Sequence, residues 1–393
     1  PYVYSGEDLK AFNFFEASSI RKVGNKYVWI YSGYSGPDYG LNSTNSSLRY
    51  AFGDTPLGPW KSGGVLVDSR APELNQDGTA LQTTNAAHNT HGSIEQINGQ
   101  WYVFYHRPPR GSGFARQSMV APIKIEYDEK SVAEGGKVII RAYDPYRKDN
   151  EWTARSSNGE EYTGAEVTSE GFHIYGLDPY QYYSAGYACY LSDIHTMQDS
   201  WDIWDNHMPI TNVKNGQIIG YKYFGFGGLN QNKKGFEGTK PGNNTKINLF
   251  LAPKTNKAFK INIWLDGPWG NNAWRGRRIG QITVPAGSAQ TITRFVANIS
   301  SVVDHLDKKH AIYLVAESNV QEILFDFAGL GFSSDKKKIT YPVVPSVNIT
   351  VNGKTINLPK YPVRATNANG ILDYNQYETS VKLPFNATKI PII

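Results

Sequence analysis

The chain of 393 residues carries 40 basic and 35 acidic side chains, and a net charge of +5 this small and scattered argues against a nucleic acid partner. Aromatic residues make up 13% of the chain, beside 38 Gly and 21 Pro, which predicts an all-β protein of two or three domains. The single cysteine, Cys189, excludes a disulfide framework within the chain, and no apolar run approaches the roughly 20 residues that span a bilayer.

A repeat is visible near the start of the chain. Shifting the sequence by 74 positions aligns SSIRKVGNKYVWIYS at 18–32 with GSIEQINGQWYVFYH at 92–106. Each copy predicts a strand, a tight turn at its GN or NG dipeptide, and a second strand. Further strand-like runs, Leu48–Phe52 and Val65–Val67, lie between the copies. Hairpins recurring at this period predict a β-propeller with elaborated blades, and chance similarity of two hairpins is the alternative.

The alignment also relates two polar residues. Glu16 and His91 stand at nearly equivalent points, just before the first strand of each copy. The innermost strands of a propeller run along its central axis, so polar residues there converge on one funnel. We therefore predict a site that contains both residues. The competing interpretations are a solvent-facing glutamate that opens a strand, and ordinary hydrogen-bonding loop residues at His88 and His91.

Four groups of motifs resemble landmarks of glycoside hydrolase family 43, in that family's order. They are FFEASSIRK with GNKYVWIYS, YAFGDTPLGPW, HNTHGSI with NGQWYVFYHR, and FARQSMVAPI, and together they cover about residues 1–145. The family consists of five-bladed propellers that trim xylan, arabinan and related plant polymers. The resemblance implies that residues 1–148 are the C-terminal part of such a propeller.

The resemblance also implies roles for individual residues. Glu16 is expected to be the general acid, Phe15 and Arg116 to bind the sugar, and His91 to lie near a structural calcium on the propeller axis. Calcium prefers oxygen ligands, so His91 would act mostly through a bound water. Arg116 offers a planar fork of donors suited to sugar hydroxyls, with a surface salt bridge as the alternative. The family's xylosidases often carry Arg-Glu here, whereas Gln117 follows in this chain.

The surroundings of Glu16 suit a proton donor. An inverting glycosidase needs one protonated carboxyl for the leaving oxygen and one carboxylate that activates water, about 6.5 to 9.5 Å apart. Phe14 and Phe15 are expected to strip water from the carboxyl of Glu16 and so to raise its pKa toward the working pH.

The second carboxylate is missing from the matched motifs. The family's base aspartate and a further aspartate that tunes the acid both precede the glutamate, so the resemblance places them before Pro1. Asp8, Asp38 and Asp54 remain, but none stands in a matching motif. We therefore expect a partial propeller that is inactive by itself.

A polar stretch at 149–161 predicts a linker, and a second domain is expected at 162–333. Its expected strands are Ile218–Phe224, Lys246–Leu251, Ala258–Leu265, Gln281–Val284, Ala311–Ala316 and Glu322–Phe327, separated by Gly, Pro and Asn. This spacing predicts a β-sandwich of the jelly-roll kind. The segments INIWLDGPWGN, RRIGQITVPAG and HAIYLVAES, followed by FAGLGF, resemble a family 6 carbohydrate-binding module.

Tryptophans of this domain are candidate sugar platforms, because flat sugar faces stack on aromatic rings. Trp269 and Trp274 lie in a Gly/Asn-rich loop and are the preferred candidates. Trp264 alternates within a strand and is expected to pack in the core, which is also the alternative for the other two.

The last residues, 339–393, follow a charged SSDKKK run and are expected to be the start of a small, truncated β domain. Short strands are predicted there at Ser346–Val351 and Thr379–Leu383. No residue of this segment indicates a chemical role.

Together these features predict a fragment of an inverting glycoside hydrolase of the α-L-arabinofuranosidase or β-xylosidase type, with an attached sugar-binding sandwich. Its partners would be oligo- or polysaccharides of the arabinan, xylan or arabinogalactan type. The resemblance implies a bacterial protein that is secreted or periplasmic, although the chain itself shows no signal peptide. The alternatives are a non-catalytic, lectin-like carbohydrate-binding protein and an exo-galactanase on the same fold.

Overall fold

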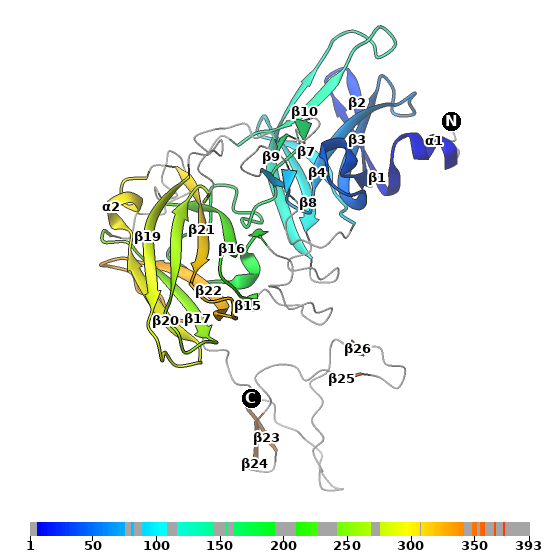
Figure 1. Ribbon diagram of the computed structural model, residues 1–393. Coiled ribbons are helices and arrows are strands. Elements are labelled where there is room, and N and C mark those ends of the chain that lie inside the picture. The colour runs from blue at the N-terminus through cyan, green and yellow to red at the C-terminus, as the bar shows by residue number, and fades with distance from the viewer. Residues whose placement is uncertain are drawn as a thin grey trace. The chain divides into compact units, whose positions relative to one another are not determined.

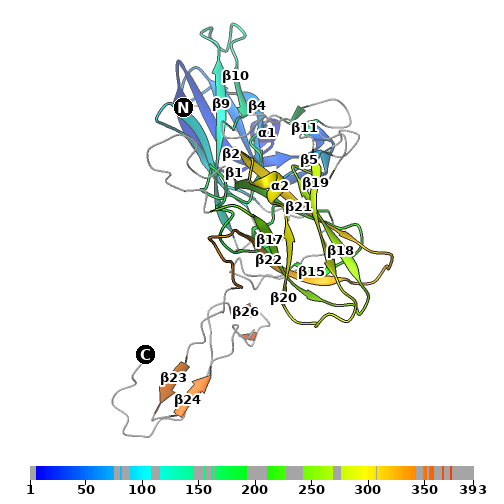
Figure 2. The same cartoon turned by 90° about the vertical axis from the view of Figure 1, so that its left-hand side faces the viewer.

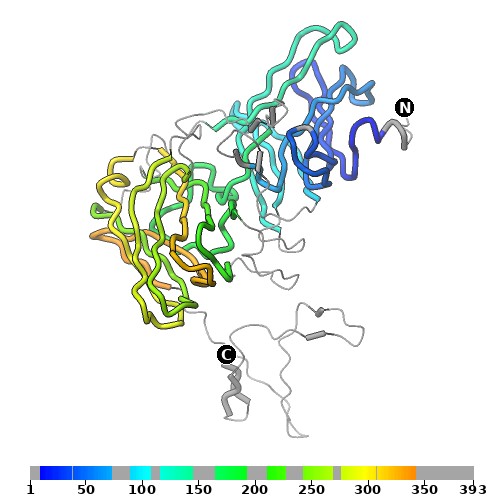
Figure 3. The backbone as a smooth tube through the Cα atoms, in the orientation of Figure 1, coloured from blue at the N-terminus to red at the C-terminus, as the bar shows by residue number. Residues whose placement is uncertain are grey.

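The structure of the chain is a computed structural model (Figure 1). It describes residues 6–74, 80–81, 89–107, 116–144, 154–155, 161–162, 164–192, 210–226, 242–268, 276–306, 308–341 and four short strands between 348 and 373. The chain divides into two compact units, Pro1–Ile339 and Thr340–Ile393, and Figure 3 follows the backbone through the first. Nearly all regular elements of the described residues are strands, which confirms the predicted all-β class.

The elements of the first 162 residues belong mainly to two sheets. They are α1 (Gly6–Ala11), β1 (Phe14–Val23), β2 (Lys26–Ser35), η1 (Pro37–Tyr39), β3 (Thr44–Gly53), β4 (Lys61–Asp68), β5 (Glu73–Leu74), β6 (Ala80–Leu81), β7 (Ser93–Ile97), β8 (Gln100–Arg107), β9 (Gln117–Tyr127), β10 (Val138–Ala142), β11 (Ala154–Arg155) and β12 (Glu161–Tyr162).

Both sheets are four-stranded and antiparallel, with the orders β1-β2-β3-β4 and β7-β8-β9-β10. Each strand pairs with the next one in the chain, which is the arrangement of a propeller blade. Buried side chains of both sheets, including Ile30, Leu48 and Val103, form one shared core. The predicted partial propeller is therefore present as two neighbouring blades (Figures 1 and 2).

The strands confirm the 74-residue repeat. β2 begins at Lys26 and β8 begins at Gln100, the residue 74 positions later. The turn before β2 needs Gly24, whose φ of 58° is left-handed and whose Cβ, if present, would strike the ring of Tyr127. Equivalent residues of the two copies also touch, because Ser19 Oγ lies 2.7 Å from Ser93 Oγ. The two first strands thus lie side by side, as a propeller axis requires.

The remaining elements form mainly a sandwich. They are β13 (Tyr183–Ser184), η3 (Ala185–Tyr187), β14 (Tyr190–Leu191), β15 (Ile210–Val213), β16 (Ile218–Gly225), β17 (Lys246–Pro253), β18 (Phe259–Leu265), β19 (Arg277–Val284), β20 (Thr293–Asn298), α2 (Ser300–Val303), β21 (Lys309–Glu317), β22 (Phe325–Ser333), β23 (Asn348–Val351), β24 (Lys354–Asn357), β25 (Ala365–Thr366) and β26 (Leu372–Asp373).

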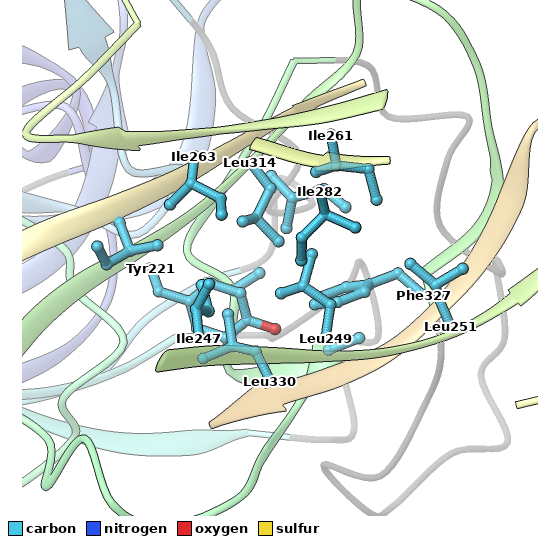
Figure 4. Close-up of a cluster of buried hydrophobic side chains, with 14 of the residues drawn as sticks. Tyr221, Ile247, Leu249, Leu251, Ile261, Ile263, Ile282, Leu314, Phe327 and Leu330 are labelled. Atoms are coloured by element: carbon cyan, nitrogen blue, oxygen red, sulfur yellow. The ribbon is translucent and has the colours of Figure 1, made fainter. Parts of the chain in front are cut away.

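The sandwich consists of two antiparallel sheets. One has the order β13-β22-β17-β20 with β15 also on β22, and the other has the order β14-β16-β21-β18-β19. Figure 4 shows Ile247 and Leu249 of the first sheet opposite Ile263 and Leu314 of the second, in a fully buried core. The β-sandwich prediction is confirmed, because alternate residues of these strands point to one shared interior.

Most predicted sandwich strands are present, but one boundary is wrong. The strand expected at Glu322–Phe327 is β22, which begins at Phe325 and continues to Ser333, because the FAGLGF segment pairs with β17 along its length. A side chain at Gly329 would strike the backbone of the neighbouring strand β13, which explains why the segment looks unlike a strand in sequence. Trp264 is half-buried against a cluster on the outer face of its sheet rather than in the central core.

The blades and the sandwich pack together through buried charges. Lys309 Nζ lies 2.6 Å from Asp144 Oδ2 and 2.8 Å from Glu170 Oε1. Lys222 Nζ lies 3.1 Å from Glu166 Oε1. We call these five residues the interface cluster. They join the end of the second blade to the segment after β12 and to two strands of the sandwich.

The proposed domain limits stay predictions. Residues 1–148 and 162–333 both lie in the first compact unit, and the linker predicted at 149–161 is described only in the short strands β11 and β12. The second unit is described as two hairpins, β23–β24 and β25–β26, and the strand predicted at Thr379–Leu383 lies outside the described residues. In the part of the chain that is described, no helix has the length and apolar character needed to cross a bilayer.

Candidate active site

Glu16 stands at an irregular point of β1. The strand begins at Phe14, so Glu16 lies within it and not just before it as expected. The pairing with β2 is irregular on both sides of Glu16, and Ala17 has a left-handed φ of 51°. Such bulges redirect side chains near the ends of strands. Because of this irregularity, the side chain of Glu16 does not have to follow the regular alternation of side chains between the two faces of the sheet.

Two side chains that precede β7 bind the carboxylate of Glu16. His91 Nε2 lies 2.7 Å from Glu16 Oε1, and the Asn89 amide donates a hydrogen bond to the same oxygen. Glu16 and His91 each keep 42% of their side chains exposed. The predicted convergence of Glu16 and His91 is therefore confirmed, and their chemical roles stay predictions.

Two further basic residues complete this group. Arg116 Nη2 donates to Asn89 Oδ1, and Arg116 Nη1 lies close to His106 Nε2, each over 3.3 Å. The backbone N–H of His91 donates to His106 Nε2 over 3.1 Å. His106 therefore accepts at Nε2 and carries its proton on Nδ1, which is buried with no hydrogen-bond partner among the described residues. We call Glu16, Asn89, His91, His106 and Arg116 the site cluster.

His106 is held in its neutral form. Burial lowers the pKa of His106 to about 4, and the positive charges of Arg116 and His91 act in the same direction. A neutral imidazole keeps a lone pair on Nε2 for the His91 backbone at neutral pH. His106 thus orients the segment that carries His91 without adding charge to the cluster.

The expected rise in the pKa of Glu16 is wrong for the described surroundings. Hydrogen bonds from His91 and from Asn89 favour the ionised carboxylate and lower the pKa of Glu16, and the charge of Arg116 acts the same way. Burial acts in the opposite direction but is weak, because the side chain is 42% exposed. The carboxyl of Glu16 is held in place here, but it is not shielded from water.

The two phenylalanines before Glu16 explain why shielding fails. Phe14 packs with Trp29 and Tyr31 at centroid distances of 5.7 Å, inside a mostly buried cluster. Phe15 stays 37% exposed and meets the equally exposed Tyr34 edge to face at 5.7 Å. Phe14 is therefore a core residue. Phe15 and Tyr34 form an exposed aromatic pair next to Glu16 in the chain, and sugar binding by Phe15 stays a prediction.

The residues around His91 do not fit a calcium cage. Calcium binds six to eight oxygen atoms, whereas His91 and His106 offer nitrogens. The carboxylate of Glu16 and the amide oxygen of Asn89 already accept hydrogen bonds. Within the described ranges no three His, Cys, Asp or Glu side chains are grouped as a metal site.

Asp54 is the one of the three remaining aspartates whose side chain is described, and its contacts are not those of a catalytic base. Asp54 Oδ1 lies 3.1 Å from Lys26 Nζ, and Asp54 Oδ2 accepts from the backbone N–H of Val132 over 2.8 Å. These contacts make Asp54 a structural residue that ties a turn of the first blade to the second. The side chains of Asp8 and Asp38 lie outside the described residues.

Sequence reasoning missed Asn89 and His106. Both stand in motifs that carry the family resemblance: Asn89 lies between His88 and His91, and His106 lies in NGQWYVFYHR. One signal for His106 was present: the 74-residue shift aligns it with Ser32, which pairs with Glu16 in the β1–β2 ladder. Of the other predicted residues, Trp269 and Trp274 lie outside the described residues, as does His88.

Comparison with known proteins finds relatives for part of the chain. No family model matches the chain. A stretch of 123 residues, 31% of this chain and 24% of the relative, is 37% identical to a xylosidase/arabinosidase of Thermoclostridium stercorarium. Another of 126 residues, 32% of this chain and 31% of the relative, is 31% identical to a xylosidase/arabinosidase of Bacteroides ovatus. About a third of the chain is similar in sequence to proteins named xylosidase/arabinosidase.

Further matches agree with this similarity. A β-xylosidase of Xylanibacter ruminicola is 33% identical over 117 residues, 29% of this chain and 28% of the relative. The chain thus spans about a quarter to a third of the length of these relatives. A family 43 arabinoxylan arabinofuranohydrolase structure from Bacillus subtilis is 18% identical and matches 82% of this chain and 54% of that one, with a TM-score of 0.36. A TM-score this low does not by itself establish a common fold.

Proposed function

We propose that the chain is part of a glycoside hydrolase of the xylosidase or arabinosidase type, with Glu16 as the general acid. The observation that carries the proposal is the carboxyl of Glu16, which is bound by Asn89 and His91 where the two blades meet. A chain segment with 37% identity to a protein named xylosidase/arabinosidase supports it. The resemblance to family 43 rests on motifs that contain all three of these residues.

In this mechanism Glu16 donates a proton to the glycosidic oxygen as the bond to the sugar breaks. Asn89 and His91 hold Oε1, so the other oxygen, Oε2, is the one that would carry the proton toward the substrate. Arg116 points its fork of donors at the same cluster and would bind sugar hydroxyls. Because the described surroundings lower the pKa of Glu16, the bound sugar or a nearby carboxylate must raise it before the proton can be carried at neutral pH.

Further parts of the proposal come from the resemblance. They are inversion at the anomeric carbon, a base aspartate outside the matched motifs, secretion or export to the periplasm, sugar binding by the sandwich, and plant polysaccharides of the arabinan, xylan or arabinogalactan type as substrates. A calcium on the propeller axis is expected only on the same ground.

The test compares Glu16→Gln with the unchanged protein, each with any residues that its gene encodes before Pro1. With xylobiose or an arabinose-substituted xylan fragment, loss of the general acid should lower kcat/KM by roughly 10²–10⁴-fold. With a 2,4-dinitrophenyl glycoside the loss should be much smaller, because dinitrophenolate departs without a proton. Glu95→Gln is the matched control, since Glu95 is an exposed glutamate on β7 that pairs with Arg21.

Each outcome separates the competing functions. Equal losses on both substrates, or none, would refute the acid role of Glu16. Binding of xylan or arabinan with no turnover of any substrate would favour the lectin-like alternative, and release of galactose alone would favour the exo-galactanase. Proton NMR of the first product formed distinguishes inversion from retention of the anomeric configuration.

A further inference from the structure

Arg107 is a fully buried arginine directly after His106 of the site cluster. It is the last residue of β8, and its side chain has no exposed surface. Successive residues of a strand point to opposite faces, so Arg107 leaves the blade on the side opposite to His106. The pKa of Arg107 is lowered by this burial, as expected for a charge removed from water.

The guanidinium of Arg107 binds three acceptors on two separate pieces of chain. Its Nε donates to Gln117 Oε1 over 2.8 Å, its Nη2 to the carbonyl oxygen of Tyr187 over 3.2 Å, and its Nη1 to that of Ala188 over 3.3 Å. Tyr187 and Ala188 belong to the turn η3 and the residue after it, at the edge of the sandwich. None of these acceptors is a carboxylate, so the geometry of the fork, rather than an ion pair, holds the group.

The hydrogen bonds of Arg107 involve residues that lie next to two members of the site cluster, His106 and Arg116. In the antiparallel pairing of β8 and β9, Arg107 lies opposite Gln117 and His106 lies opposite Ser118. Arg116 directly precedes Gln117, so the guanidinium of Arg107 links the strand that carries His106 to the residue that follows Arg116. The start of β9 is held a second time, because the backbone N–H of Val120 donates to the carbonyl of Gly171 over 3.1 Å.

We propose that Arg107 is a positioning residue that fixes His106 and Arg116 against the sandwich, so that the turn at 185–188 is a structural part of the candidate active site. The expected effect of Arg107 on kcat rests on the proposed function, whereas its expected effect on the surroundings of His106 does not. The sandwich would then hold part of the candidate active site in place, in addition to any role in sugar binding. The rival explanation is a clamp that stabilises the contact between blades and sandwich and leaves the site unaffected.

The experiment compares Arg107→Lys with Tyr223→Phe. Lysine keeps the charge of Arg107 but cannot bind three acceptors in one plane. Tyr223→Phe removes one buried hydrogen bond, from the Tyr223 hydroxyl to Glu166 Oε2 at 2.6 Å, from the segment that packs on the sandwich. Both variants lose polar contacts near the same interface, so both should unfold at a lower temperature. Gln117→Met serves as a milder second variant of the Arg107 contact if Arg107→Lys does not fold.

The first measurement needs no activity. NMR titration of the histidine ring signals should show the pKa of His106 rising from about 4 toward 6.5 in Arg107→Lys, because a displaced β8 end admits water. The second measurement is kcat and KM on a xyloside or arabinoside, where kcat should fall by about tenfold to a hundredfold while KM changes little. Tyr223→Phe should leave both the pKa of His106 and kcat unchanged.

The outcomes separate the two proposals. An unchanged His106 titration in a folded Arg107→Lys or Gln117→Met variant would overturn the positioning role, whatever the activity. Equal effects of Tyr223→Phe on the titration would show a general loosening of the fold and would also overturn it. A shifted titration in Arg107→Lys would uphold the positioning role even if the unchanged protein, with any residues that its gene encodes before Pro1, showed no glycosidase activity, and that lack of activity would refute the proposed function.

Discussion

The site cluster and the interface cluster each place a glutamate beside a basic side chain, but the pKa values of these two glutamates shift in opposite directions. Glu16 keeps 42% of its side chain exposed, and hydrogen bonds from His91 and Asn89 lower its pKa. Glu170 is 4% exposed, and burial raises its pKa to about 8 in spite of the cation of Lys309. Hydrogen bonds thus set the direction of the pKa shift at the partly exposed Glu16, and the loss of water sets it at the buried Glu170. A partly exposed carboxyl stays accessible to a substrate, whereas a buried one serves the packing of the two regions.

Removing the cation of the interface cluster should have the largest effect on stability. Lys309→Met removes the counter-charge of Asp144 and the donor that binds Glu170 and the carbonyl oxygen of Ile174, so the free energy of unfolding should fall by about 3–5 kcal/mol. Urea unfolding followed by tryptophan fluorescence measures this change. The control is Lys257→Met, because Lys257 is 61% exposed and lies 3.9 Å from Glu322. Similar losses in the two variants would contradict the contrast between buried and exposed charges.

The pH dependence of stability should reveal Glu170. Its folded-state pKa is raised from 4.5 to about 8, so the folded state binds the proton more tightly than the unfolded state. This contribution to stability is fully present below pH 4.5 and is lost as the pH rises through about 8. The slope that Glu170 adds should reach up to about 1.4 kcal/mol per pH unit between these limits.

Glu170→Gln should remove that slope, because glutamine resembles the protonated acid at every pH. Urea unfolding at several pH values between 5 and 8 would show the variant gaining stability relative to the unchanged protein as the pH rises. Glu126→Gln is the matched control, since Glu126 is 48% exposed and pairs with Lys124 on the same strand. Parallel curves for Glu170→Gln and the unchanged protein would rule out a raised pKa at Glu170.

The smallest loss of stability is expected from breaking the exposed ion pair between the two blades. Arg21 Nε lies 3.2 Å from Glu95 Oε2, with side chains 38% and 54% exposed. Arg21→Gln should therefore lower the free energy of unfolding by no more than about 0.5 kcal/mol, and 1 M salt should abolish the difference. A loss comparable with that of Lys309→Met would mean that this pair is shielded from solvent.

Much of the fold could be predicted because its signals are local. Alternating apolar residues and Gly-Asn turns predicted the blade hairpins and most sandwich strands, and the 74-residue shift aligned Ser19 with Ser93, whose hydroxyl groups are in contact. The strand at Phe325–Ser333 was placed too early, since its glycines are explained only by the close approach of β13 and its neighbours. That close contact between strands cannot be predicted from a single sequence.

The site could be predicted only in part. The repeat brought Glu16 and His91 together, but it could not predict that the bulge beside Ala17 lets Asn89 reach the same oxygen. The pKa of Glu16 was expected to rise because Phe14 and Phe15 precede it in the chain. Nearness in the chain does not ensure contact: the ring of Phe14 packs on Trp29, and Phe15 stays 37% exposed.

By itself the sequence determined the class of fold, the repeat of the two blades and the meeting of Glu16 with His91. These follow from periodicity and turn chemistry, which are properties of neighbouring residues. Only the tertiary structure decided which carboxyls are shielded from water and how Arg107 and Lys309 join the blades to the sandwich. Burial and charge pairing depend on atoms that are far apart in the chain, so their free energies exist only once the sheets have packed.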